Sequence, residues 1–328
     1  MALFRKNGFV LLLLGAVALA WGVPEFGAPD GPLRAELLAR IGVMVVFFLQ
    51  GLTLRTRELA QGVGNIRLHL LVQGWIFLGS AIIHGAASLA LKAMGYPDLA
   101  AGFIYLALLP TTITSAILFT SAANGNVSGA IFNTTLANVI GVFWVPLGCL
   151  LLFTAGSGFP ADMVLGLLLK VARLILLPLV IGQLLRPLVS GTSWFKKISR
   201  GFKYINHGII LFIVYSTLSQ SFLSNAWSGI GGGVVLFLLG LTLLAVLLVH
   251  GLVWLSSGRI VTRPGDRITA LFCGSQKTLA AGAPMAVAIF STGEHLARFN
   301  IGLLLLPLLC YHPIQLFLAA LILPKFDN

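Results

Sequence analysis

The most unusual feature of the sequence is a lysine in the middle of a long apolar segment from Ile268 to Gly293. Lys277 is the single charged residue of this segment, and it lies about 15 Å from Arg267 at helical rise. An ionisable residue near the centre of a membrane span indicates a functional site. The alternative is a packing role with the side-chain stem extended to the interface, which this distance disfavours. We therefore expect Lys277 to bind an anion or to take the place of a cation.

Other polar residues beside this lysine could bind an ion or a substrate: Cys273, Ser275, Gln276 and Thr278. The same segment contains poor helix formers, namely Gly274, Gly282 and Pro284. Irregular backbone at membrane depth is tolerated only where it lines a cavity or is buried in protein. The pattern therefore predicts a helix that is broken near Gln276 and contributes to a site.

A second polar stretch begins at Pro110 and carries four hydroxyl groups in another apolar segment: Thr111, Thr112, Thr114 and Ser115. Proline interrupts the helical hydrogen-bond ladder, and short hydroxyls can bind the freed backbone groups or a ligand. A single hydroxyl in a helix commonly bonds to its own preceding turn. Four hydroxyls beside one proline favour a site instead, with the helix unwound near Thr112.

Amide side chains add further candidates in two neighbouring apolar segments. Asn133, Thr134 and Asn138 follow the second polar stretch, and Gln73 precedes it. An amide in hydrocarbon is costly unless it is hydrogen-bonded. These residues could therefore line the same site, or they could only hold helices together.

The composition identifies the class of protein. Of the 328 residues, 58% are hydrophobic and 9% are charged, against about 25% charged in soluble domains. Mean hydropathy is +1.00. These values predict a polytopic helical membrane protein. The net charge of +12 is then explained by basic cytoplasmic loops rather than by nucleic-acid binding.

Apolar segments of roughly 20 residues mark membrane spans. The chain offers ten of them: 7–24, 37–54, 68–91, 99–123, 127–154, 163–185, 204–223, 234–257, 268–292 and 299–323. The first resembles a signal peptide, but its length favours a retained helix. If both termini are cytoplasmic, most of the 21 Lys and Arg residues lie on the cytoplasmic side of the membrane, as the positive-inside rule requires. A bacterial inner (plasma) membrane protein with this orientation is predicted.

The ten spans divide into two halves of five. Because five is an odd number, the two halves have opposite topologies in the membrane. The two polar, interrupted spans are the penultimate span of each half. Inverted repeats with broken helices at matching positions are typical of secondary transporters. An intramembrane enzyme is disfavoured because no Asp or Glu lies at mid-membrane, and the sequence predicts no cofactor and no dedicated metal site.

At this point the sequence resembles a known family. The segment Leu271–Ala280 is similar to the broken ninth helix of the bile acid:sodium symporters. Leu109–Ser115, followed by Gly125-Asn126-Val127, resembles their broken fourth helix and the start of their fifth. The resemblance covers nearly the whole chain. It is strongest to a divergent branch of bacterial symporters and their eukaryotic "member seven" relatives.

The resemblance implies a fold and an ion site. Spans 3, 4, 5, 8, 9 and 10 would form a core domain (61–158 and 231–328) in which helices 4 and 9 cross. Spans 1, 2, 6 and 7 would form a panel domain (1–60 and 159–230). The residues at the family's sodium positions are Gln73, Ser115, Thr134, Ser275 and Gln276, with the backbone at Cys273. These residues are expected to converge on one cavity wall.

The chain departs from the family pattern at the ion site. Phe272 stands where the family has Glu, and Lys277 stands where it has Asn. One carboxylate is lost and one ammonium is gained, which predicts altered ion coupling, with sodium or a proton as the coupling ion. Our first hypothesis is alternating-access transport of an organic anion. The alternative is a membrane regulator, without transport, that is linked to calcium homeostasis.

Overall fold

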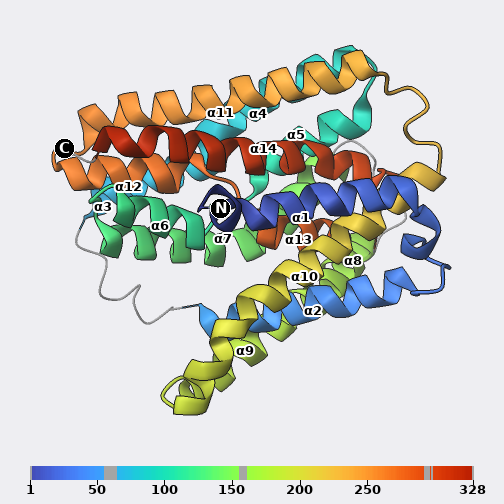
Figure 1. The fold of residues 1–328 in the computed structure, drawn as a ribbon, viewed down its shortest axis with the longest axis horizontal. Helices are drawn as coiled ribbons and strands as arrows, with labels where there is room; N and C mark the ends of the chain where they lie inside the picture. Colours follow the sequence, from blue (N-terminus) through green and yellow to red (C-terminus); the bar gives the residue numbers. More distant parts are fainter. Residues whose placement is uncertain (1, 55–64, 155–160, 292–295, 297, 327–328) are drawn as a thin grey trace. The chain divides into compact units, whose positions relative to one another are not determined.

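The computed structural model describes residues 2–54, 65–154, 161–291, 296 and 298–326. Within these ranges the chain is helical and forms no strand (Figure 1). The first half contains α1 (Ala2–Gly22), η1 (Pro24–Gly27), α2 (Ala35–Thr53), α3 (Ile66–Gly74), η3 (Trp75–Gly79), α4 (Ser80–Ala93), α5 (Pro97–Leu108), α6 (Thr114–Ala122) and α7 (Val127–Thr154). The second half contains α8 (Ala161–Leu174), α9 (Leu176–Val189), α10 (Ser193–Leu223), α11 (Gly232–Ile260), α12 (Pro264–Ser275), α13 (Leu279–Phe290), α14 (Ile301–Ile322) and η4 (Leu323–Phe326).

Six helical segments among the described residues are long and apolar enough to cross a membrane: Ala35–Thr53, Ile66–Ala93, Val127–Phe153, Leu168–Val189, Gly232–Ile260 and Ile301–Phe326. Two shorter apolar helices are Gly8–Gly22 and Pro97–Leu108. The predicted all-helical membrane class is therefore confirmed. The ten-span inverted repeat stays a prediction.

The chain divides into two compact units. The first unit comprises residues 1–54, 146–231 and 280–305, and the second comprises 55–145, 232–279 and 306–328. Several helices, including α7 and α14, run from one unit into the other. Both polar, interrupted stretches predicted from the sequence belong to the second unit.

In the first unit α2 packs along α9 and α1 packs along α10 (Figure 1). The α2–α9 contact depends on two glycines, because a Cβ at Gly182 would lie 2.4 Å from the carbonyl oxygen of Phe48. A Cβ at Gly51 would likewise lie 2.2 Å from the carbonyl oxygen of Leu179. Small residues at such positions let two backbones approach closely.

Helix α10 is longer than the predicted span 204–223, which is a correction to the sequence interpretation. It begins at Ser193, where the Thr192 side chain caps the helix by accepting from the Phe195 amide at 3.2 Å. Phe195 and Phe202 are buried in a cluster with Leu49 and Leu52 of α2. The exposed basic residues between these rings hide this apolar contact from a search for uncharged segments.

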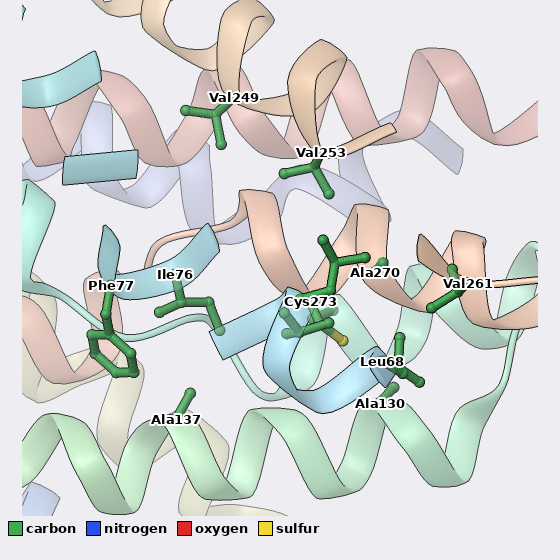
Figure 2. Packing of buried hydrophobic residues seen from close by; sticks show 13 residues of the cluster. Leu68, Ile76, Phe77, Ala130, Ala137, Val249, Val253, Val261, Ala270 and Cys273 are labelled. Carbon is green, nitrogen blue, oxygen red and sulfur yellow. The ribbon is translucent and has the colours of Figure 1, made fainter. Parts of the chain in front are cut away.

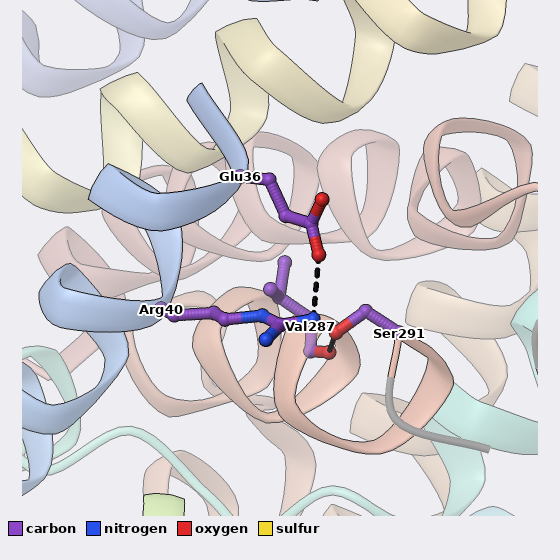
Figure 3. A network of polar contacts seen from close by, with 4 residues as sticks. All are labelled: Glu36, Arg40, Val287 and Ser291. Atoms are coloured by element: carbon purple, nitrogen blue, oxygen red, sulfur yellow. Dashed lines mark hydrogen bonds and ion pairs between the residues drawn. The ribbon is translucent and has the colours of Figure 1, made fainter. Parts of the chain in front are cut away.

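Figure 3 shows two local polar contacts of the first unit. Arg40 and Glu36, one turn apart on α2, form an ion pair with a 2.5 Å N–O distance. Ser291 donates to the carbonyl oxygen of Val287 one turn earlier. Exposed pairs of the first kind add little stability.

The second unit has a core around a π-helical turn. Here η3, a five-residue π-helix from Trp75 to Gly79, interrupts the α3–α4 helix. Its Ile76 is fully buried in a cluster with Val249 and Val253 of α11 and Cys273 of α12 (Figure 2). π-Turns in helices frequently occur at functional sites because they change which backbone groups face inward.

Two helices of the second unit are interrupted, as the sequence predicts. Helix α5 ends at Leu108 because Leu109, the residue before Pro110, has extended backbone angles. The chain becomes helical again at Thr114. The second interruption lies between α12 and α13, at residues 276–278.

The second interruption is narrower than the sequence indicates. Gly274 lies in the last turn of α12, and both Gly282 and Pro284 lie inside α13. These three residues were expected to break the helix, and this expectation is corrected. The unwound residues include Lys277 and Thr278, whose backbone groups bond to Gln315 of α14 and to Pro110 of the first interruption.

Pro110 fits against α7 only because residue 141 is glycine. A Cβ there would lie 2.6 Å from Cγ of Pro110. We therefore expect Gly141→Ala to destabilise the protein by about 1–3 kcal/mol through overpacking, although Ala normally favours a helix over Gly. Gly240→Ala on α11 is the control, because no atom lies within 4 Å of that Cβ position. Thermal unfolding in detergent measures both, and equal midpoints would contradict this close contact.

Candidate functional site

The two interruptions lie against each other in the second unit. The Thr278 amide donates to the carbonyl oxygen of Pro110 at 3.0 Å. Gln276 Oε1 accepts from Thr112 Oγ1 at 2.8 Å and from Ser115 Oγ at 2.9 Å. Unwound backbone groups and short polar side chains of the two broken helices therefore satisfy one another.

The Lys277 side chain is buried beside this contact and is only 1% exposed. Its ammonium donates to three backbone carbonyl oxygens, those of Ile76 at 2.7 Å, Ala107 at 3.0 Å and Leu109 at 2.8 Å. An ammonium has three protons, so its hydrogen-bonding capacity is filled. Among the described residues it has no ion pair.

The three carbonyls are available for local structural reasons. The last four carbonyls of an α-helix have no intrahelical partner, which frees Ala107 near the end of α5. Leu109 lies in the interruption itself. Ile76 belongs to the π-helical η3 and also accepts from the Ser80 hydroxyl at 2.7 Å. The C-terminal end of a helix favours a positive charge, so the end of α5 suits the ammonium.

The backbone of Lys277 is held by a glutamine from α14. Its amide donates to Gln315 Oε1 at 2.7 Å, and its carbonyl accepts from Gln315 Nε2 at 2.8 Å. Gln315 is fully buried and also contacts His312. The Tyr311 hydroxyl donates to the carbonyl oxygen of Ser275 at 3.0 Å. Helix α14 thus supplies the partners that a continuous helix would have provided.

The amide residues of α7 connect it to neighbouring segments. Asn138 donates to the carbonyl oxygen of Thr111 at 3.0 Å, which fixes α7 to the first interruption. Gln73 donates to the carbonyl oxygen of Asn133 at 3.0 Å. Thr134 bonds back to Ala130 of its own helix at 2.8 Å. The contacts of Asn138 and Gln73 are those expected of residues that hold helices together, whereas that of Thr134 stays within its own helix.

The structure brings together only some of the residues expected to converge. Ser115 and Gln276 are in contact, whereas the hydrogen bonds found for Gln73 and Thr134 go to other groups. The hydrogen-bond acceptors of the ammonium are all backbone carbonyls, one of them in the first interruption, and neither Ser115 nor Thr134 is among them.

Three further candidates have local roles in the structure. Ser275 donates to the carbonyl oxygen of Leu271 at 2.6 Å. Cys273 packs in the apolar cluster of Figure 2. Thr114 starts α6 and is exposed.

Two residues of the site were not identified from the sequence. Ile76 contributes only its carbonyl, and a π-turn has no compositional signal. Gln315 lies toward the end of the predicted span 299–323, where an amide is commonly a contact between helices. Its pairing with a broken helix in another part of the chain could be recognised only in three dimensions.

Residue 272, where the sequence resemblance implies a Glu, is apolar here. Phe272 is fully buried and stacks on Phe119 at a centroid distance of 5.6 Å. It also meets Phe326 edge-on at 6.2 Å. This position therefore offers no carboxylate to a bound cation.

Three buried polar atoms at or beside the interruptions have no hydrogen-bond partner among the described residues. They are Gln276 Nε2, Gln73 Oε1 and Thr111 Oγ1. An unsatisfied buried polar atom costs about 1–3 kcal/mol. Such atoms are sites at which a ligand or water gains binding energy.

Comparison with known proteins supports a transport role. Residues 7–328 match the SBF-like CPA transporter family. "Uncharacterized protein PA2026" of Pseudomonas aeruginosa is 33% identical over 98% of this chain and 93% of its own length. "Putative symporter YfeH" of Escherichia coli is 33% identical over 100% of this chain and 95% of its own. "Sodium/bile acid cotransporter 7" of Xenopus tropicalis is 30% identical over 99% of this chain and 92% of its own length.

The Gln315 contact makes a stability prediction. Gln315→Leu leaves the buried amide and carbonyl of Lys277 without partners, which should cost roughly 2–5 kcal/mol. Gln315→Glu keeps the acceptor and loses the donor. Its stability should therefore lie between that of Gln315→Leu and that of the unmodified protein. Gln220→Leu, at an exposed position of α10, is the control. Thermal unfolding in detergent measures all three, and equal midpoints would show that α14 does not hold the interruption.

Proposed function

Because the chain belongs to the SBF-like CPA transporter family, we propose that it is a secondary transporter that moves an organic anion by alternating access. Relatives named as a symporter and as a sodium/bile acid cotransporter support this class of function. We place the protein in the bacterial inner membrane with ten spans and both termini in the cytoplasm.

The two compact units support a division into two functional parts. Residues 1–54 and 146–231 group together, as do 55–145, 232–279 and 306–328. This agrees broadly with a panel of 1–60 and 159–230 and a core of 61–158 and 231–328. Residues 280–305 group with the first unit instead. The proposed boundaries near 60 and 158 lie outside the described residues.

We assign the Lys277 ammonium the role of a tethered cation. Three carbonyl oxygens within 3.0 Å surround it, an arrangement that also suits a dehydrated metal cation. Its three protons are already bonded, so it has no free donor for a substrate carboxylate. This arrangement is the single observation that favours sodium-independent transport, with a proton rather than sodium as the coupling ion.

The substrate anion would bind beside the lysine rather than on it. Helices α6 and α13 begin immediately after the two interruptions, and helix N-termini favour anions. The open Gln276 Nε2 offers a buried donor, and Thr112 and Ser115 hold its amide group from the other side. These donors are suited to a carboxylate or sulfonate.

Uptake into proteoliposomes tests this proposal. The purified protein should exchange organic anions, with bile acids as the first probes, equally in sodium and in choline buffers. Lys277→Gln should abolish uptake driven by a proton gradient, because it removes the tethered cation. Lys92→Gln, at the exposed end of α4, should leave uptake unchanged.

Three outcomes would contradict parts of the proposal. Uptake that requires sodium and saturates with it would exclude the tethered cation. A Lys277→Gln variant that keeps its proton coupling but binds substrate more weakly would mean that the lysine binds substrate. Absence of counterflow for every anion tested would favour a membrane regulator linked to calcium homeostasis.

A further inference from the structure

A polar pocket of about 470 Å³ lies in the second unit, away from the two interruptions. Its walls come from the starts of three helices, α3, α7 and α12, together with the end of α11. Each helix start contributes a partial positive charge. Three of them at one pocket create a region that favours a negative group.

A buried aspartate holds the three helix starts together. Asp266 is 3% exposed and accepts from Asn65 Nδ2 and Asn126 Nδ2, both at 2.7 Å. The same two asparagines cap α3 and α7 through their Oδ1 atoms, which accept from Leu68 N at 3.3 Å and Gly129 N at 2.9 Å. Both carboxylate oxygens are therefore bonded, and the pocket wall is preorganised.

Two arginines give this pocket an excess of positive charge. Arg67 and Arg263 both line it and both are exposed. Neither forms an ion pair in the described part of the chain. Two guanidinium groups outweigh the single carboxylate of Asp266. Guanidinium is also the side chain best matched to the geometry of a phosphate.

An apolar pocket continues from the polar one. It is lined by Leu70, Leu71, Gly74, Trp75 and Gly79, and it shares Arg67 and Ile260 with the polar pocket. The absence of side chains at the glycines contributes to its depth. From Arg67 to Gly79 the helix extends about 18 Å, close to the ~15 Å half-thickness of a bilayer core.

We propose that these two pockets bind one anionic phospholipid. Its phosphate contacts Arg67 and Arg263, and an acyl chain lies along η3, between Gly74 and Gly79. The occupant is amphipathic because a charged pocket and an apolar pocket share the same arginine. The lipid would contact the π-helical turn whose Ile76 carbonyl binds the Lys277 ammonium. This site is independent of the transported anion and of the coupling ion.

Lipid binding to the purified, delipidated protein tests the charged end of the site. Phosphatidylglycerol should raise the thermal midpoint, and phosphatidylcholine with the same acyl chains should not. The double variant Arg67→Gln/Arg263→Gln should weaken phosphatidylglycerol binding at least about tenfold, because two charge-assisted contacts are lost. Arg259→Gln is the matched control, since Arg259 is exposed in the last turn of α11 and lines neither pocket.

The apolar pocket of the proposed lipid site is tested by a substitution that fills it with a larger side chain. No atom lies within 4 Å of a Cβ at Gly74, so Gly74→Leu is accommodated and should reduce phosphatidylglycerol binding at least about tenfold. Gly85→Leu on α4, where a Cβ is equally unhindered, should have no effect on binding. Each variant is compared with its own lipid-free midpoint, which separates loss of binding from loss of folding.

Two results would overturn the proposal. Equal midpoint shifts with the two lipids would show that no anionic headgroup is recognised. If glycerol 3-phosphate alone matches the lipid and Gly74→Leu still binds, the polar pocket holds a soluble anion instead. Neither result depends on transport, so the proposed transport function could fail or hold separately.

Discussion

Burying an ammonium group without a carboxylate is the constraint on which the second unit depends. Removing such a charge from water is costly unless every proton finds an acceptor. The three carbonyls of Ile76, Ala107 and Leu109 meet this requirement. None of these oxygens would be available from the middle of a regular α-helix, so the lysine and the irregular backbone require each other.

The remaining polar contacts follow from that arrangement. Opening α5 at Pro110 exposes backbone groups, and the carbonyl of Pro110 is taken up by the Thr278 amide. The unwound Lys277 would itself lose two helical hydrogen bonds, and Gln315 replaces both. Each interruption is therefore stabilised by the other and by α14. This reciprocal bonding makes irregular backbone tolerable at membrane depth.

Similarity to proteins named as symporters and the chemistry of this site lead to different expectations about ion coupling. Similarity over nearly the whole chain supports the same kind of fold and transport. At the ion site, Phe272 is part of an aromatic cluster with Phe119 and Phe326. An apolar ring cannot neutralise a metal cation, whereas three carbonyl dipoles accept the hydrogen bonds of the Lys277 ammonium.

Residue type and spacing alone determined the membrane class and the positions of both interruptions, and they distinguished Lys277 as a charge in an apolar segment. These properties are local, because hydropathy, a central charge and a proline act within one segment. Only the tertiary structure decided which oxygens bind the ammonium, that Gln315 holds the second interruption, and that Pro284 lies inside a helix. Those outcomes depend on backbone groups from distant segments. A carbonyl is present at every residue, so the sequence carries no mark of the one that is used.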